Sequence, residues 1–116
     1  MTRARIEFGG EGERVAEDYL TDKGYRVIER SYRCKIGQID LVMRDGDTIV
    51  FVEVKNRSSS VFGRPEEAVD GRKQRKLMRL AEAFLLYRRI TDVPVRFDVV
   101  AILDGKIEHI PDAFRA

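Results

Sequence analysis

The chain has 116 residues, of which 43% are hydrophobic and 36% are charged, with 22 Lys and Arg against 20 Asp and Glu. This balance excludes collagen-like, low-complexity and disulfide-rich chains. No apolar run reaches the ~20 residues that cross a bilayer, and residues 1–7 lack the apolar stretch of a signal peptide. We therefore expect a cytoplasmic protein with no membrane partner.

The single cysteine, Cys34, and the single histidine, His109, restrict the metal chemistry. They exclude an internal disulfide, a multi-cysteine zinc site and a His-rich centre. Any metal site must use carboxylates, which favours hard cations such as Mg²⁺ or Mn²⁺. The net charge of +2 says little about nucleic acid, because clustering of cations matters more than their total.

Hydrophobic periodicity predicts a single α/β domain over 1–116, with the order helix, three strands, helix, two strands. In chain order these are a helix over 12–23, strands over 25–30, 38–43 and 48–55, a helix from near Asp70 or Gly71 to near Arg89, and strands over 95–103 and 106–110. Residues 31–36 are expected to form a connecting turn and 56–63 a polar loop. Pro65 is expected to open a helical region.

The strands around Asp45-Gly46 form a predicted hairpin. The register that we expect pairs Val42 with Ile49, and alternation then divides the side chains between two faces. One face carries Gln38, Asp40, Val42, Ile49, Phe51, Glu53 and Lys55. The other carries Ile39, Leu41, Met43, Val50, Val52 and Val54 and is entirely apolar.

In this register Asp40 and Glu53 are diagonal neighbours, with Cα atoms roughly 7–8 Å apart. Two close carboxylates repel unless a cation or a proton separates them, so both could bind one Mg²⁺. Lys55 points the same way and would lie beside a water or phosphate, as metal-assisted phosphodiester hydrolysis requires. The alternative is a surface salt bridge, which contributes at most ~1 kcal/mol. The β-branched strand looks buried on both faces, which favours the functional interpretation.

Two helical features extend this hypothesis. Glu13, near the start of the first helix and at the rim of its apolar stripe, could supply a further metal contact, although the helix dipole alone favours an acidic residue there. On the long helix a basic ridge falls within about a 100° arc, while Lys73 points toward the apolar side. The ridge consists of Arg72, Arg75, Lys76 and Arg79. It either binds phosphates or is a solvated face, and Arg57 and Arg64 would extend it.

The remaining polar and aromatic candidates have less specific signals. We expect His109 to be a surface residue in an edge strand, and Asp98 to join the charged face or to pair with a helix cation. Tyr25, Tyr32 and Tyr87 are expected to fill the edges of the core.

The segments Gly37-Gln38-Ile39-Asp40-Leu41 and Phe51-Val52-Glu53-Val54-Lys55 resemble the PD-(D/E)xK nuclease superfamily and, within it, the YraN-like family of bacterial proteins. The resemblance extends over nearly the whole chain. Its other pieces are Gly12-Glu13, Ala16, Tyr19-Leu20, Gly24-Tyr25, Arg57, Phe62-Gly63, Glu67-Ala68-Val69, Lys73 and Arg96-Phe97-Asp98-Val99-Val100.

The resemblance implies a restriction-endonuclease-like core, a mixed central sheet of about five strands flanked by helices. It implies that Asp40 and Glu53 hold a divalent metal, that Lys55 assists the attacking water, and that Glu13 completes the site. Gln38 stands where a glutamate is expected, but its amide oxygen can still be a metal ligand. Ser31 replaces a usual asparagine.

The leading hypothesis is a nuclease dependent on Mg²⁺ or Mn²⁺, or a nuclease-fold DNA-binding protein, that acts on structured or branched DNA. Lys73 and the basic ridge would hold phosphates; the oligomeric state is left open, with a homodimer as the option that would suit cutting of two strands. The alternative is a non-catalytic module for nucleic-acid or protein binding that keeps the fold, with its carboxylates salt-bridged to Lys55.

Overall fold

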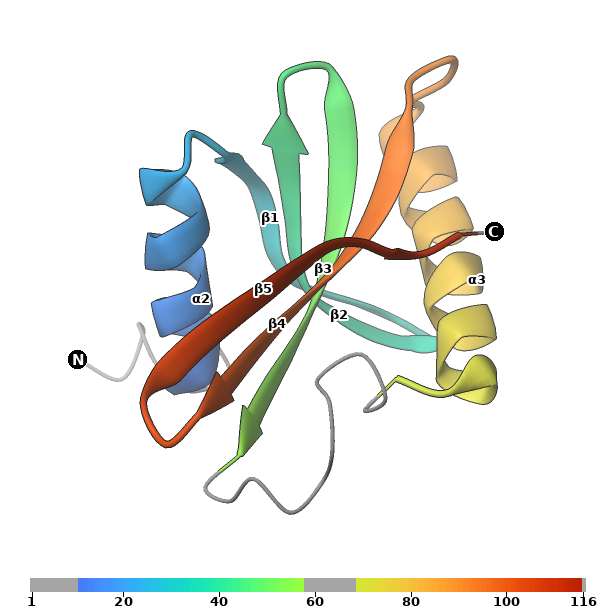
Figure 1. The fold of residues 1–116 in the computed structure, drawn as a ribbon. Helices are drawn as coiled ribbons and strands as arrows, with labels where there is room; N and C mark the ends of the chain where they lie inside the picture. The colour runs from blue at the N-terminus through green and yellow to red at the C-terminus, as the bar shows by residue number, and fades with distance from the viewer. Residues whose placement is uncertain (1–10, 58–68, 116) are drawn as a thin grey trace, which may run out of the picture.

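The computed structural model describes residues 11–57 and 69–115 and contains one sheet with a helix on each face (Figure 1). The elements are α2 (Glu11–Asp22), β1 (Arg26–Cys34), β2 (Gly37–Asp45), β3 (Thr48–Arg57), α3 (Gly71–Arg88), β4 (Val95–Leu103) and β5 (Lys106–Phe114). The five strands lie in the order β1-β2-β3-β4-β5. Only the β3–β4 pair is parallel, because the connection through α3 returns the chain to the same end of the sheet. The predicted α/β class and element order are confirmed.

Both ends of α3 agree with the predicted bounds. Asp70 is the N-cap, and its side chain accepts a hydrogen bond from the Lys73 backbone N–H at 2.9 Å. Arg89 adopts a left-handed conformation with φ 56°, and its N–H bonds to the carbonyls of Leu85 and Leu86. No helix in the described ranges is long and apolar enough to cross a membrane.

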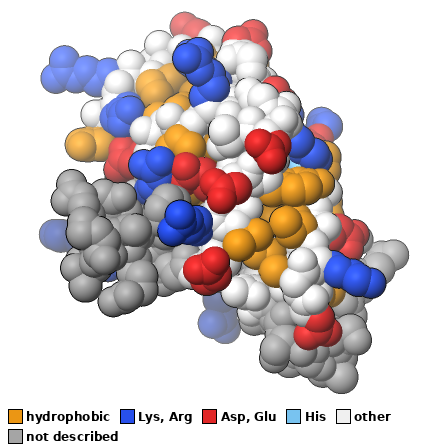
Figure 2. Space-filling model, turned by 90° about the vertical axis from the view of Figure 1, so that its left-hand side faces the viewer, with side chains coloured by type: hydrophobic (Ala, Val, Ile, Leu, Met, Phe, Trp, Pro, Cys, Tyr) orange, Lys and Arg blue, Asp and Glu red, His pale blue; other side chains and the backbone are white. Residues whose placement is uncertain are grey.

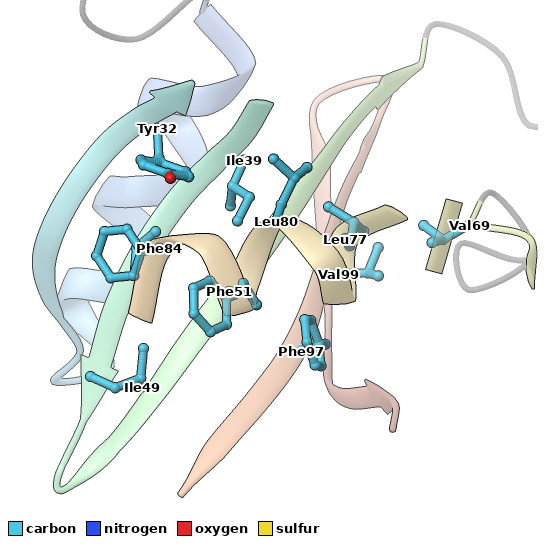
Figure 3. Close-up of a cluster of buried hydrophobic side chains, with 12 residues drawn as sticks. Tyr32, Ile39, Ile49, Phe51, Val69, Leu77, Leu80, Phe84, Phe97 and Val99 are labelled. Atoms are coloured by element: carbon cyan, nitrogen blue, oxygen red, sulfur yellow. The ribbon is translucent and has the colours of Figure 1, made fainter. Parts of the chain in front are cut away.

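Each face of the sheet has its own apolar cluster. Beneath α3 the buried cluster comprises Tyr32, Ile39, Val42, Ile49, Phe51, Val69, Leu77, Leu80, Ala81, Phe84, Phe97 and Val99 (Figure 3). Beneath α2 it comprises Ala16, Leu20, Tyr25, Leu41, Met43, Val50, Val52 and Val100. The two helices are therefore fixed on opposite faces of one sheet, and both begin near the same end of β3 (Figure 1).

The predicted register of the β2–β3 hairpin is wrong by two residues. Val42 pairs with Phe51, not with Ile49, and Asp45 pairs with Thr48. The two-residue loop therefore contains Gly46, at φ +62°, and the residue after it. A shift of two residues preserves the alternation of side chains between faces, so most face assignments hold.

Three further expectations are also corrected. The expected turn over 31–36 is limited to residues 35–36, because β1 continues to Cys34 through an irregularity between Val27 and Glu29. Ile39 packs beneath α3 and not on the face that carries Leu41. The pairing of β2 with β3 ends at Leu41, and the residues of β2 before Leu41 pair with β1 alone. Tyr25 and Tyr32 are buried as expected, but Tyr87 is 66% exposed. The expected loop over 58–63 and Pro65 lie outside the described residues.

Candidate active site

The predicted acidic residues meet in a pocket where β2 and β3 diverge, between the first turns of α2 and α3. The pocket has a volume of about 460 Å³. Its lining residues are Glu13, Arg33, Gln38, Asp40, Glu53, Lys73, Lys76, Leu77 and Leu80. It thus unites residues that are up to 67 positions apart in the sequence (13 and 80) and combines acidic, basic and apolar side chains.

Glu53 is the buried centre of this site. Its side chain is 7% exposed, and its Oε2 atom lies 2.8 Å from Lys73 Nζ and 3.3 Å from Lys55 Nζ. Lys55 reaches it from the same strand and Lys73 from α3, so two ammonium groups share one carboxylate oxygen. Burial, followed by the neighbouring charge and hydrogen bond of Lys73, lowers the pKa of Lys55, although Glu53 opposes this shift.

Asp40 projects from β2 beside the end of β3. Its Oδ2 atom accepts a hydrogen bond of 2.8 Å from the Val54 backbone N–H, which ties it to the strand that carries Glu53. Burial raises the pKa of Asp40 to about 8, with further increases from the charges of Glu53 and Glu13. At neutral pH and without a bound cation, Asp40 therefore retains a proton.

Glu13 enters the site from α2. Burial raises its pKa, as does the charge of Glu53, while a side-chain hydrogen bond with Asp40 opposes the rise. Its Oε1 atom is buried and has no hydrogen-bond partner among the described residues. Gly12 allows the start of α2 to lie close to β3, because a Cβ atom at this position would lie 2.9 Å from Asn56 Nδ2 and 3.1 Å from Asn56 Cβ.

The donor set suits a hard divalent cation. Three carboxylates and the Gln38 amide border one pocket, and such oxygen donors are what Mg²⁺ and Mn²⁺ prefer. A bound cation would give the unpartnered Glu13 Oε1 atom a ligand bond, and it would take the place of the proton on Asp40. Within 11–57 and 69–115, however, no three His, Cys, Asp or Glu side chains already converge as ligands. These residues have the donor chemistry of a metal site, but their side chains do not form a ligand cage in this structure.

A model of the uncharacterised protein family UPF0102 matches residues 12–102. The chain belongs to this family. A UPF0102 protein of Thermodesulfovibrio yellowstonii is 50% identical to it over 111 residues, covering 96% of this chain and 98% of the relative. Another from Moorella thermoacetica is 50% identical over 110 residues, covering 95% of this chain and 92% of the relative. The predicted membership of the YraN-like family is thereby confirmed, whereas membership of the PD-(D/E)xK superfamily stays a prediction.

Among solved structures, SfsA of Pyrococcus furiosus in complex with Ca²⁺ matches 93% of this UPF0102 protein and 63% of its own chain. The TM-score is 0.33 and the sequence identity is 12%. A similarity this low supports no conclusion about fold or function.

The basic ridge of this UPF0102 protein lies on α3 as predicted. Arg72, Arg75, Lys76 and Arg79 are exposed, and Lys76 also borders the pocket. Lys73 differs, because it turns to Glu53 as its position toward the apolar side implied. Figure 2 shows acidic and basic side chains next to one another on the face that bears α2. Arg64 and the side chain of Arg57 lie outside the described part of the chain.

A second polar cluster was not foreseen. His109 is not a surface residue: its side chain is 2% exposed, and Nε2 lies 2.7 Å from Oδ2 of the fully buried Asp98. Asp98 pairs with Arg96 at 2.9 Å and not with a helix cation. Burial would raise the pKa of Asp98, but hydrogen bonds from His109, Arg96 and the Asp112 N–H hold it below its usual value.

This cluster links the segment that follows α2 to the sheet. Lys23 Nζ contacts His109 Nδ1 at 2.9 Å, and Arg96 also bonds to Tyr25 and, at 3.1 Å, to Asp45. Its residues do not line the pocket that contains Glu53. The alternation of Arg96 and Asp98 in the sequence was a signal for the pair, whereas the contribution of His109 depends on how β5 pairs with β4.

Proposed function

We propose that this UPF0102 protein is a metal-dependent endonuclease that hydrolyses phosphodiester bonds in structured or branched DNA. The observation that carries the proposal is the buried Glu53 carboxylate, which pairs with Lys55 and lines one pocket together with Asp40 and Glu13. A buried carboxylate cluster with an adjacent lysine is rare unless it has a function. The resemblance to PD-(D/E)xK nucleases supports the same chemistry.

In this proposal Asp40, Glu53 and Glu13 hold Mg²⁺ or Mn²⁺, with the Gln38 amide as a further donor. The cation supplies Lewis-acid activation of the phosphate and of the attacking water. Lys55 orients that water by its ammonium group and stabilises charge that develops on the phosphate. The exposed ridge on α3 binds the DNA backbone beside the pocket.

The test is cleavage of a panel of labelled DNA substrates, including duplex, single-stranded, flapped and four-way-junction DNA, with Mg²⁺ or Mn²⁺. The wild type should cut at least one substrate, and Glu53→Gln, which removes charge but keeps shape, should not. The matched control is Glu82→Gln, at an exposed position on α3. Equal cutting by wild type and Glu53→Gln would overturn the catalytic assignment.

A second candidate is a nucleic-acid-binding module without catalysis. It is favoured by one observation: Lys55 and Lys73 already compensate Glu53 without a metal. Such a module would bind DNA through the ridge but would not bind Mn²⁺ at the carboxylates. Calorimetric titration of Mn²⁺ into wild type and Glu53→Gln therefore distinguishes the two functions.

A further inference from the structure

Lys73 has two properties that the other cations at the start of α3 do not share. Its backbone N–H is held at 2.9 Å by the Asp70 cap, so its position in the first turn is fixed. Its ammonium lies 2.8 Å from Glu53 Oε2, closer than the 3.3 Å of Lys55. Arg72 and Arg75, on either side, are exposed. Lys73 therefore contacts the buried Glu53 carboxylate and also adjoins the exposed basic ridge.

The two lysines at Glu53 differ in freedom to move. Lys55 is on β3, whose backbone pairs with Ala101 of β4, and its side chain is 16% exposed. The side chain of Lys73 is 40% exposed and comes from the first turn of α3, not from a strand of the sheet. Lys73 is therefore the ammonium that can leave Glu53 without disturbing the sheet.

We propose that Lys73 is a positioning residue that balances the charge of Glu53 until a divalent cation binds, and then moves to the DNA phosphate backbone. The inference rests on the proposed function of the same site. A cation and the Lys73 ammonium require the same carboxylate oxygen and repel one another, so they compete. Once released, Lys73 extends the ridge formed by Arg72, Arg75, Lys76 and Arg79.

Competition of this kind has two linked consequences. Removal of the Lys73 ammonium makes the carboxylates more available, so the affinity for Mn²⁺ rises. In the wild type, DNA that draws Lys73 away also raises the affinity for Mn²⁺, and by linkage Mn²⁺ raises the affinity for DNA by the same factor. This mutual enhancement requires a positively charged side chain at position 73.

The experiment is a calorimetric titration of Mn²⁺ into the full chain, repeated with a short DNA duplex that carries nuclease-resistant phosphorothioate linkages. Lys73→Met should bind Mn²⁺ about tenfold more tightly than the wild type without DNA, and DNA should no longer enhance the binding. Arg44→Met, which removes one positive charge from an exposed position on β2 without touching Glu53, should bind Mn²⁺ as the wild type does. Lys73→Arg should restore the competition.

The outcomes separate the inference from the proposed function. If the wild type binds Mn²⁺ but Lys73→Met binds it equally or more weakly, the role of Lys73 is overturned and the metal site stands. If Arg44→Met gains as much affinity for Mn²⁺ as Lys73→Met, the effect is one of general charge and the inference also fails. If the wild type and every variant fail to bind Mn²⁺ while remaining folded by circular dichroism, both proposals are overturned.

Discussion

Lys55 Nζ lies 3.3 Å from Glu53 Oε2. The two residues are two positions apart on β3, so an ammonium group and a carboxylate share one face at the end of the strand. Their neighbour Val54 donates its N–H to Asp40 at 2.8 Å, which adds a second carboxylate from the adjoining strand. A stretch of three residues therefore organises most of the proposed site. This arrangement leads to predictions for catalysis, stability and DNA binding.

Lys55→Met should reduce DNA cleavage by about 100-fold or more, because a positioned acid, base or ammonium contributes about 10²- to 10⁴-fold. Binding of Mn²⁺ should persist, since all carboxylates remain. The measurement is single-turnover cleavage beside a calorimetric titration. Lys35→Met, at an exposed position in the β1–β2 turn, is the matched control and should cut normally. Wild-type cleavage by Lys55→Met would exclude a catalytic role.

Asp40→Asn should make metal-free protein more stable at high pH. The pKa of Asp40 is about 8 in the folded protein and near 4 when unfolded, so its stabilising protonated form is lost as the pH rises toward and through 8. Asparagine stays neutral and keeps an oxygen for the Val54 N–H. In EDTA, we expect Tm to exceed that of the wild type by about 5 °C at pH 9 and to converge with it near pH 4.

The control for this pH dependence is Asp47→Asn, because Asp47 is exposed at the hairpin. The Tm of Asp47→Asn should not rise above that of the wild type between pH 4 and 9 as the Tm of Asp40→Asn does. A constant offset between Asp40→Asn and wild type from pH 4 to 9 would contradict the assignment of a raised pKa to Asp40.

The element order and the carboxylate constellation were predictable because they depend on local information. Asp-Gly signals locate hairpins, and alternation decides which residues share a face, so Glu53 and Lys55 could be paired from their spacing alone. The register error of two residues left this parity intact. Ile39 was misplaced because strand divergence depends on how β2 leaves β3, which no local pattern encodes.

The contacts that were missed join distant segments. Helical spacing predicts only the side of α3 on which Lys73 lies. Its contact with Glu53 depends on where α3 packs along the sheet. His109 is buried against Asp98 because β5 pairs with β4 and α2 covers them, whereas an edge strand in isolation suggests exposure. Packing, and not propensity, determines both.

Asp98→Asn should destabilise the protein by about 3 kcal/mol, because it leaves Arg96 and His109 without the buried carboxylate that they share. Urea unfolding measures this change. Asp45→Asn removes the second carboxylate partner of Arg96, which is 44% exposed, and should cost at most ~1 kcal/mol. Equal losses for the two variants would show that burial of the network does not determine its contribution.

The ridge should determine the salt dependence of DNA binding. Replacing Arg72, Arg75 and Arg79 together by glutamine should reduce the slope of log K against log salt by about 3, since each lost phosphate contact removes about 1. Fluorescence anisotropy with a labelled duplex measures the slope. Arg44→Gln, at an exposed position on β2, is the control. An unchanged slope in the triple variant would place the DNA elsewhere on the molecule.

The most direct measurement is the anomalous diffraction of crystals soaked with Mn²⁺. The proposal predicts one strong peak in the pocket, at a bonding distance of about 2.0–2.2 Å from oxygens of Asp40 and Glu53, with the Lys73 ammonium withdrawn from Glu53. A well-ordered pocket with no peak, or a peak remote from both carboxylates while Lys73 stays paired, would contradict the metal-dependent function.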